Sequence, residues 1–528
     1  MTAHAGMSGN GVTTASAASD TQDFTGMVDL AAVRLGGMAL AANDEYFAAK
    51  ENLLLARPPT FDPHRYSDRG KQMDGWETRR RREPGHDWCV LRLGVPGVVR
   101  GVVVDTSFFR GNYPDRCSLD GCAADDALAA DDLADAEWFP LLGETPLTGD
   151  TRNAFSIEAS QRVTHLRLNI FPDGGVARLR VHGEPLPDLR RRVDAGGRLD
   201  LAAVVNGGTV PTCSDMFFSP GHNLVTVGDG RDMGDGWETR RRRGPGHDWA
   251  IVRLATQGVI ERVEVDTTNF KGNYPDRCSL ETCDAGNVAV PPDDAEWHAL
   301  LAPSRLGPHA RHVFDVGGAR PATHVRLNIF PDGGVARLRL HGAITEAGWR
   351  STGVRWLNAL PAPAFADEVS TCCASTAWAA GLAETRPFAD FDALLAAADQ
   401  AWEATGPEDW QQAFAAHPRI GASISATPGR GTADREQGRG WSQHEQSGTQ
   451  AASPETLEAL AEGNRAYEQR FGHVFLICAT GRSADEMLAA LRTRMGNEPD
   501  TELRVAAEEQ RKITRLRLAK LVLSRAAT

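Results

Sequence analysis

The stretch THLRLNIFPDGGVARLRVHG at residues 164–183 returns as THVRLNIFPDGGVARLRLHG at residues 323–342, and 18 of the 20 positions are identical. Apolar and polar residues alternate on both sides of PDGG, which is the pattern of strands with one buried face. PDGG supplies turn residues, so the stretch predicts a β-hairpin in each copy. Residues 102–105 and 263–266 indicate further strands, each ending on an aspartate where a loop begins.

The recurrence extends over most of the first 345 residues, at offsets of 171, then 161, then 159 positions. Asp44 corresponds to Asp215, for example, and GNYPDRCSL is identical at 111–119 and 272–280. The first copy has ten extra residues around RPPTFDPHRYSDRG at 57–70. Each copy, about 150–160 residues long, is large enough to be a domain, unlike the short units of solenoids. Short strands separated by Gly, Pro and Asp turns predict an antiparallel sandwich or jelly roll in each copy, and the closing strands resemble those of galactose-binding-like domains.

From Leu357 onward the pattern becomes helical. Residues 388–402 and 455–471 have apolar residues three and four positions apart, and residues 501–524 predict a long amphipathic helix. We therefore expect a separate all-α domain after the two β domains. The predicted organisation is a disordered tail at 1–21, β repeats at 22–183 and 198–343, linkers at 184–197 and 344–356, and the all-α domain at 357–528.

Composition excludes several classes of protein. Hydrophobic residues make up 41% of the chain, and no apolar run approaches the ~20 residues of a membrane helix. The first 20 residues have neither the basic nor the apolar region of a signal peptide, so we expect a cytoplasmic protein without a membrane partner. A net charge of −13 argues against nucleic acid as a general partner. Nine scattered cysteines are not typical of a disulfide framework. The C-x4-C pairs at 117–122 and 278–283 are wider than usual zinc spacing and favour buried thiols over a metal site.

A dense polar stretch is also duplicated. It is DGWETRRRREPGHDW at 74–88 and DGWETRRRRGPGHDW at 235–249, and the copies differ only at Glu83 and Gly244. Arginine forks suit a carboxylate, Asp, Glu and Asn accept hydrogen bonds from urea-type N–H groups, and a His beside an Asp suits proton transfer. The alternative is a solvated surface with DGW and GNYPDR as turns. Because the copies differ freely elsewhere, retention of the whole set favours a site for a small anion rich in N–H donors.

We expect Trp76, Trp88, Trp237 and Trp249 to pack rather than to bind ligands. The candidate substrate-binding residues of the β repeats are Glu77, Arg79, Asp87, Asp105, Asn112 and Arg116 in the first copy, and Glu238, Arg240, Asp248, Asp266, Asn273 and Arg277 in the second. The candidate catalytic residues there are His86 and His247.

DGWETRRRR, GHDW, the DT-x-x-F-[RK]-GNYPD segment and RLNIFPDGGVARLR resemble the allantoicase family over roughly residues 22–345. The resemblance implies hydrolysis of allantoate to (S)-ureidoglycolate and urea by a duplicated jelly-roll protein. That reaction needs a protonated leaving urea, an activated water and a clamp on the carboxylate. We expect the two histidines to transfer protons and the arginines to bind the carboxylate. The duplication leaves open one shared site or one site in each copy, and the intact polar sets favour the second.

In the all-α domain, HPRIG at 417–421 and SQHEQSG at 442–448 flank a 20-residue polar loop. With LNALP, STCCASTAW, FGHVFLICATGRSADEML and EEQRKITRLRL, they resemble the family of 2-oxo-4-hydroxy-4-carboxy-5-ureidoimidazoline (OHCU) decarboxylases over about 357–525. The resemblance implies formation of (S)-allantoin without a metal or organic cofactor, with His417 and Glu445 as catalytic residues. Substrate contacts are expected from Pro418, Ser442, Ile477 and Arg517.

The combined prediction is a bifunctional enzyme of urate catabolism that acts on allantoate and OHCU. The alternative is that the β domains form a non-catalytic carbohydrate- or anion-binding module and that only the helical domain is an enzyme. A homo-oligomer is compatible with the sequence, which does not determine the oligomeric state.

Overall fold

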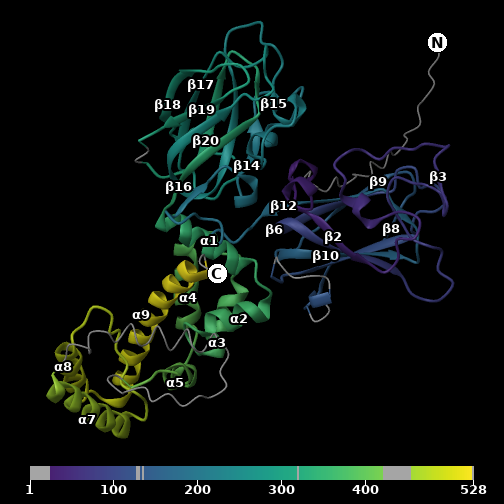
Figure 1. The fold of residues 1–528 in the computed structure, drawn as a ribbon. Helices are drawn as coiled ribbons and strands as arrows, with labels where there is room; N and C mark the ends of the chain where they lie inside the picture. Colours follow the sequence, from purple (N-terminus) through teal and green to yellow (C-terminus); the bar gives the residue numbers. More distant parts are fainter. Residues whose placement is uncertain (1–23, 126–130, 134–135, 318–319, 420–452, 526–528) are drawn as a thin grey trace, which may run out of the picture.

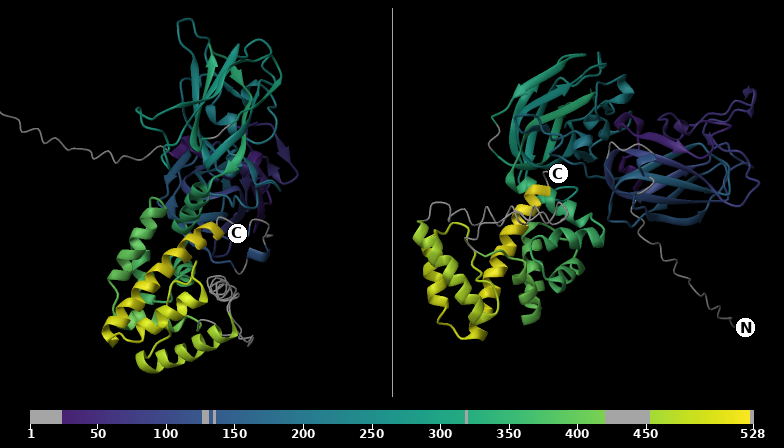
Figure 2. Two further views of the ribbon diagram at one scale, coloured as in Figure 1. Left: turned by 90° about the vertical axis from the view of Figure 1, so that its left-hand side faces the viewer. Right: turned by 60° about the horizontal axis from the view of Figure 1, so that its bottom comes forward.

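The computed structural model describes residues 24–125, 131–133, 136–317, 320–419 and 453–525. Two sheet-rich sandwich domains precede a helical domain, which confirms the predicted fold class (Figure 1). Figure 2 shows the helical domain joined to the β domains at α1, with α7 and α8 farthest from them. Among the described residues no helix is long and apolar enough to cross a membrane.

In the first β domain one strand, β6 (Asp87–Asp105), joins both layers of the sandwich. Its first half pairs with β10 (Arg162–Phe171) and its second half with β12 (Arg178–Pro185), with register shifts between. The other strands are β1 (Val28–Asp29), β2 (Met38–Ala42), β3 (Tyr66–Ser67), β4 (Gly70–Lys71), β5 (Trp76–Glu77), β7 (Arg116–Cys122), β8 (Phe139–Pro146), β9 (Arg152–Ser156) and β11 (Gly175–Val176). The short 3-10 helices are η1 (Phe24–Gly26), η2 (Val33–Leu35), η3 (Lys50–Leu54) and η4 (Asp131–Leu133).

The hairpin predicted around PDGG is wrong. Strands β10 and β12 do not pair with each other, because each pairs with a different half of β6. Between them β11 pairs with β5 instead. Apolar residues alternate along β10 and β12 because one face of each strand points into the interior of the sandwich. Leu166 and Leu168 of β10 and Leu179 and Val181 of β12 are fully buried there. A period of two identifies strands with a buried face, but it does not identify the partner strand.

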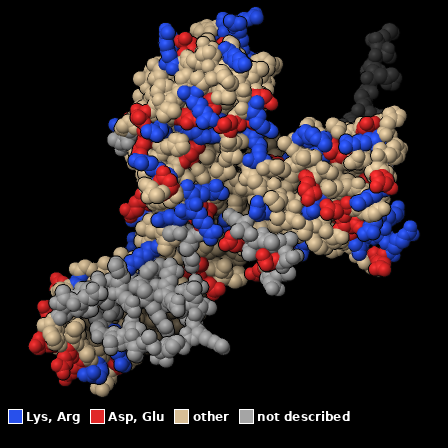
Figure 3. All heavy atoms as spheres, viewed as in Figure 1, with Lys and Arg blue, Asp and Glu red and all other residues tan. Residues whose placement is uncertain are grey.

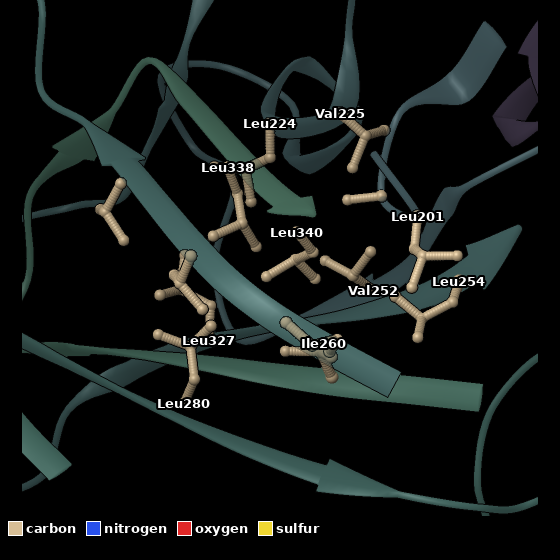
Figure 4. Packing of buried hydrophobic residues seen from close by; sticks show 14 of the residues in the cluster. Leu201, Leu224, Val225, Val252, Leu254, Ile260, Leu280, Leu327, Leu338 and Leu340 are labelled. Atoms are coloured by element: carbon tan, nitrogen blue, oxygen red, sulfur yellow. The ribbon is translucent and has the colours of Figure 1, made fainter. Parts of the chain in front are cut away.

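The second β domain repeats this topology around β16 (Asp248–Asp266). Its other strands are β13 (Arg198–Asp200), β14 (Thr209–Cys213), β15 (Trp237–Glu238), β17 (Arg277–Cys283), β18 (His298–Arg305), β19 (Arg311–Asp315), β20 (Ala322–Phe330), β21 (Gly334–Val335) and β22 (Arg337–Ile344), with η5 (Val204–Asn206), η6 (Gly221–Val225) and η7 (Met233–Asp235). Its core consists of side chains such as Val252, Ile260, Leu280, Leu327 and Leu340, which point from several strands into one interior (Figure 4).

The paired glycines of each repeat allow a close backbone approach after a short 3-10 helix. Gly36 and Gly207 have left-handed φ values of +102° and +106°. A Cβ on the following glycine, Gly37 or Gly208, would lie about 2 Å from the carbonyl oxygen of Ala31 or Ala202. Only glycine fits there without moving the backbone.

The C-x4-C cysteines do not form a shared metal site. Cys117 packs in the interior between the layers, whereas Cys122 packs with Val90 and Leu133 in a separate cluster. Residues five positions apart on one strand face opposite sides of the sheet. Burial raises the pKa of the Cys117 thiol to about 12, as expected of a structural thiol.

The aspartate of each DGW motif holds a buried arginine. Arg178 is 2% exposed and donates to Asp74 Oδ1 at 3.0 Å, and Arg337 donates to Asp235 Oδ2 at 3.1 Å. Each guanidinium also donates to backbone carbonyls, including that of its own aspartate partner. This part of the duplicated stretch is therefore structural.

Replacing Arg337 with methionine is expected to lower the free energy of unfolding of the second β domain by about 3 kcal/mol, because it leaves buried carbonyl groups and Asp235 without a main donor. Urea unfolding followed by circular dichroism measures the change. The matched control is Arg262→Met, which breaks an exposed ion pair with Asp315 and should cost less than about 1 kcal/mol. Equal losses in the two variants would contradict the structural role of Arg337.

The helical domain contains the three helices expected from the sequence, as α4 (Phe391–Glu403), α7 (Pro454–Phe471) and α9 (Pro499–Arg525). The others are α1 (Glu346–Asn358), α2 (Ala362–Ser370), α3 (Thr376–Glu384), α5 (Pro407–Ala415) and α8 (Ala484–Arg494). Side chains of Asp390 and Ser453 cap α4 and α7 by accepting backbone N–H bonds. Most of the expected linker at 344–356 belongs to α1, which packs against α9 and β16.

Polar contacts join the three domains at α1. Arg355 donates to the carbonyl oxygens of Pro185, at the end of β12, and of Ala255 in β16, and burial lowers its pKa to about 10. The guanidinium of Arg190 lies 4.0 Å from the ring centroid of Trp349. Arg34 of the first β domain lies 3.3 Å from Asp235 of the second. The linker around 184–197 therefore packs between domains.

Candidate functional site

Both ends of the long central strand lie at the same end of each sandwich. Residue 170 on β10 pairs with Asp87 at the start of β6, and Arg178 on β12 pairs with Asp105 at its end. The segment between β10 and β12 bonds to both of the other loops, because Gly175 N donates to Asn112 O at 2.7 Å and Arg81 N donates to Asp173 Oδ2 at 2.9 Å. The polar loops before β6, after β6 and between β10 and β12 therefore gather at one end of the domain.

The first group of residues there surrounds a buried carboxylate. Asp87 is 1% exposed and accepts hydrogen bonds from Arg81 Nη1 at 2.7 Å and Asn43 Nδ2 at 2.9 Å. Among the described residues, Asp87 Oδ2 and Arg81 Nε have no hydrogen-bond partner. A buried polar atom without a partner costs free energy unless a ligand or water satisfies it. The second β domain has the same pair, Arg242 and Asp248.

The adjacent histidine packs on an aromatic ring. The ring centroids of His86 and Phe171 are 4.7 Å apart, and those of His247 and Phe330 are also 4.7 Å apart. In the second domain His247 Nε2 lies 3.2 Å from Asn328 Oδ1. The equivalent Asn169 Oδ1 is buried without a partner among the described residues. We call Arg81, His86, Asp87, Asn169 and Phe171 the His86 cluster, and Arg242, His247, Asp248, Asn328 and Phe330 the His247 cluster.

The asparagine of each cluster is held from behind by hydroxyl and carboxylate groups. Asn169 Nδ2 donates to Ser118 Oγ at 3.0 Å and to Asp120 Oδ2 at 2.9 Å. In the second domain Asn328 donates to Ser279 and Glu281. These bonds fix the amide nitrogen, so the amide oxygen of Asn328 points toward His247.

A second buried carboxylate belongs to β5. Glu77 Oε1 accepts from Asn112 Nδ2 at 2.7 Å, and Glu77 Oε2 is buried without a partner among the described residues. Burial raises the pKa of Glu77, while the bond from Asn112 opposes the shift. Glu238 and Asn273 form the same hydrogen bond in the second domain. The structure thus brings two of the predicted residues of each repeat into contact with each other.

The predicted arginines pair with acidic side chains. Arg79 is 64% exposed and pairs with Asp44, and Arg240 pairs in the same way with Asp215. Arg116 lies on the surface 3.4 Å from Glu144, and its guanidinium is 5.8 Å from the ring centroid of Phe171. The equivalent Arg277 pairs with Asp276.

The aspartates that end β6 and β16 bind loop backbone. Asp105 Oδ1 accepts from the Ser107 amide at 2.8 Å, and Asp266 Oδ1 accepts from the Thr268 amide at 2.7 Å. Asp105 lines a pocket with Arg152 and Arg180, and the lining of this pocket includes no residue of the His86 cluster. The role of Asp105 and Asp266 in substrate binding stays a prediction.

Tryptophan packing is confirmed most clearly for Trp76 and Trp237, which are fully buried and donate to the carbonyl oxygens of Asp44 and Asp215. Trp88 is half-buried and packs against a small apolar cluster, and Trp249 is half-buried.

Sequence reasoning missed the groups that hold the clusters together. They are Asn43, Asp44, Ser118, Asp120, Asn169, Phe171 and Asp173 in the first domain, and Ser214, Asp215, Ser279, Glu281, Asn328, Phe330 and Asp332 in the second. Most of them stand in stretches identical between the repeats, so identity between copies was the signal that could have found them. Basic and acidic side chains intermingle on the viewed face of both β domains, as expected for local ion pairs (Figure 3).

In the helical domain His417 follows α5 and faces residues of α9. Burial, followed by the positive charge of Arg517, lowers the pKa of His417 to about 3, and a hydrogen bond with the Gln510 side chain opposes the shift. The imidazole is therefore neutral at neutral pH. Arg517 is 7% exposed, and the thiols of Cys372 and Cys373 lie within its electrostatic reach.

Ile477 is buried in the segment between α7 and α8, where the next amide, of Cys478, donates to Glu509 Oε2 on α9 at 2.7 Å. Pro418 follows His417 directly and is half-buried. Glu445 and Ser442 lie outside the described residues. The part of this site that the structure describes is thus a neutral histidine beside a buried arginine. Within the described residues no group of three or more His, Cys, Asp or Glu side chains is arranged to hold a metal ion.

Comparison with known proteins separates the β domains from the helical domain. A family model described as allantoicase repeat matches residues 28–186 and 199–345, and one described as OHCU decarboxylase matches residues 358–519. A probable allantoicase of Burkholderia pseudomallei (strain K96243) is 49% identical over 325 residues, covering 60% of this chain and 95% of that protein.

Two solved structures are similar to the two parts. The crystal structure of allantoicase from Saccharomyces cerevisiae is 34% identical and covers 60% of this chain and 92% of that chain, with a TM-score of 0.50. A crystal structure of OHCU decarboxylase in the presence of (S)-allantoin is 38% identical and covers 30% of this chain and 97% of that chain, with a TM-score of 0.25.

Proposed function

Because the chain belongs to the allantoicase family, we propose that its β domains hydrolyse allantoate to (S)-ureidoglycolate and urea. We propose in addition that the helical domain, which the OHCU decarboxylase model matches, converts OHCU to (S)-allantoin. The chain is then a bifunctional enzyme of purine catabolism with small ureides as substrates. The two steps are not consecutive, because the hydantoin ring of allantoin must be opened between them.

The observation that carries the first activity is the presence of the same histidine cluster in both β domains. In hydrolysis, the oxygen of water bonds to the central carbon of allantoate and the bond from that carbon to one ureido nitrogen breaks. His86 or His247 accepts the proton of the attacking water and delivers it to the leaving nitrogen, so the proton leaves with urea. The aromatic ring under each histidine and the ion pair beside it hold the imidazole in place.

Other predicted residues of the same polar loops suit the rest of the substrate. The exposed guanidinium groups of Arg79 and Arg116 can bind the carboxylate of allantoate. Buried oxygens of Glu77 and Asp87, which lack partners among the described residues, can accept the ureido N–H groups. The second domain carries the equivalent residues, which supports one site in each repeat.

In the second activity the carbon–carbon bond to the carboxylate breaks and CO2 leaves. The electron pair stays on the carbon and is delocalised into the adjacent imine and carbonyl until a proton adds. A neutral His417 can donate or accept a hydrogen bond on the substrate, and Arg517 can balance the negative charge that develops. Glu445 is the proposed partner of His417 by resemblance to the family.

A direct assay tests both activities on the full chain. With allantoate we expect release of one urea per turnover together with a glyoxylate derivative, and with freshly generated OHCU we expect the circular dichroism of (S)-allantoin to develop faster than without protein. Absence of urea release together with saturable sugar binding would favour a binding module instead of a hydrolase.

One observation favours that second candidate function. Phe217 and Phe218 are 64% and 61% exposed, and carbohydrate-binding modules usually expose aromatic platforms. The guanidinium of Arg240, however, lies 5.2 Å from the ring centroid of Phe217 and covers part of it. The concentration of Arg, Asp and His at the same end favours the hydrolase.

All nine cysteines are free thiols. Free thiols are typical of reducing compartments, which supports the cytoplasmic location proposed from the sequence.

A further inference from the structure

The extra segment of the first repeat lies beside a pocket whose lining includes no residue of the His86 cluster. Pro58 and Pro59 of this segment line a pocket of about 370 Å³ together with Asp105, Phe108, Arg152 and Arg180. Phe61 of the same segment stacks on Phe108, with ring centroids 5.7 Å apart and an interplanar angle of 16°. Pockets for small ligands have about this volume or more.

Arg152 of this pocket and its counterpart in the second repeat, Arg311, have different acidic neighbours. In the second repeat Arg311 pairs with Asp229 and lies 3.9 Å from Glu264 and 3.8 Å from Asp266. Arg152 occupies the same place on β9 and pairs in register with Asp105, the counterpart of Asp266. The counterpart of Glu264, however, is Val103, and prolines of the extra segment line the pocket.

Arg152 therefore lacks ion pairs equivalent to those of Arg311 with Asp229 and Glu264. Its side chain is exposed, and within the described residues its guanidinium makes no hydrogen bond or ion pair. The other two arginines of the pocket are already engaged. Arg178 binds Asp74, and Arg180 lies 3.7 Å from Asp29 and donates to carbonyl oxygens of the chain. Burial and the positive charges of Arg178 and Arg152 lower the pKa of Arg180, while Asp29 and Asp105 oppose the shift.

Asp105 requires a hydrogen-bond donor from a ligand, whereas Arg152 requires a negatively charged group. One oxygen of Asp105 accepts the Ser107 amide, and a carboxylate has capacity for further donors. A ligand that satisfies both groups must present a carboxylate to Arg152 and an N–H donor to Asp105. The apolar faces of Val103, Pro58 and Phe108 leave room for a small carbon skeleton between them.

We propose that this pocket is a second binding site, present in the first repeat only, for a small carboxylate that carries a ureido or amino N–H donor. It makes the two β domains unequal in ligand binding, although their histidine clusters are alike. The site rests on Arg152, Asp105 and the extra segment and not on the histidines of the proposed hydrolase.

The test is a calorimetric titration of the full chain with hydantoate, which has one carboxylate and one ureido group. Acetate and urea each carry one of the two groups and serve as matched probes. We expect hydantoate to bind at least tenfold more tightly than either. In Arg152→Gln we expect the hydantoate isotherm to lose one site per chain, whereas Arg311→Gln, the matched change in the second repeat, should leave it unchanged.

A second variant keeps Arg152 and adds an acidic side chain that can pair with it. Val103→Glu gives the first repeat the carboxylate that the second has at Glu264, and it should remove the same binding site as Arg152→Gln. Urea release from allantoate should persist in Arg152→Gln. The proposal is overturned if hydantoate does not bind, if Arg152→Gln binds like the unaltered chain, or if both glutamine variants lose binding equally. Loss of urea release in Arg152→Gln would also overturn it, because the pocket would then be the hydrolytic site.

Discussion

Replacing His417 with alanine is expected to slow formation of (S)-allantoin from OHCU by about 10²–10⁴-fold, the usual range for loss of a proton-transfer group. The imidazole is held neutral because burial and the charge of Arg517 lower its pKa to about 3. A neutral imidazole can accept a hydrogen bond from the substrate or donate one to it, and the charge of Arg517 acts on this histidine. The rate is measured by circular dichroism with OHCU generated enzymatically.

The control for this variant is Arg419→Ala. Arg419 lies two residues after His417, and its replacement removes an exposed ion pair with Glu468. It should change the rate by less than about threefold, since exposed ion pairs contribute little. Urea release from allantoate should be unchanged in both variants. A joint loss of the two activities in His417→Ala would show that the sites are not independent, and an unchanged rate of allantoin formation would remove His417 from the mechanism.

Replacing both His86 and His247 with asparagine is expected to reduce urea release from allantoate by about 10²–10⁴-fold. Each single variant should retain about half of the activity, because each β domain holds a histidine on a phenylalanine ring with the same 4.7 Å separation and beside the same Arg–Asp pair. Initial rates of urea release at saturating allantoate measure the three variants against the unaltered chain.

The matched control is His64→Asn, an exposed histidine in the extra segment of the first repeat, which should have no effect on the rate. If either single variant abolished urea release, the two clusters would contribute to one shared site. If the double variant kept the full rate, the histidines would not transfer the proton. These results are separate from those for His417, which lies in another domain.

Much of the architecture could be predicted because repeated and periodic patterns depend on local sequence. The duplicated stretch at 164–183 and 323–342 identified two equivalent domains, and apolar spacing located helices α4, α7 and α9 within a few residues. The contacts among the candidate site residues could not be predicted. Glu77 and Asn112 bond to each other, whereas Arg79 pairs with Asp44. Asn43 and Ser214, which bind the cluster aspartates, differ between the repeats and gave no signal.

By itself the sequence determined the order of the domains, the family and the residue types gathered in each polar stretch. Only the tertiary structure decided that β10 and β12 pair with different halves of β6, since strand pairing depends on contacts between distant segments. It also decided that Asp105 belongs to a pocket with Arg152 and that His417 is neutral. Burial and the charge of neighbours from other elements determine these properties, and neither is encoded in the spacing of residues along the chain.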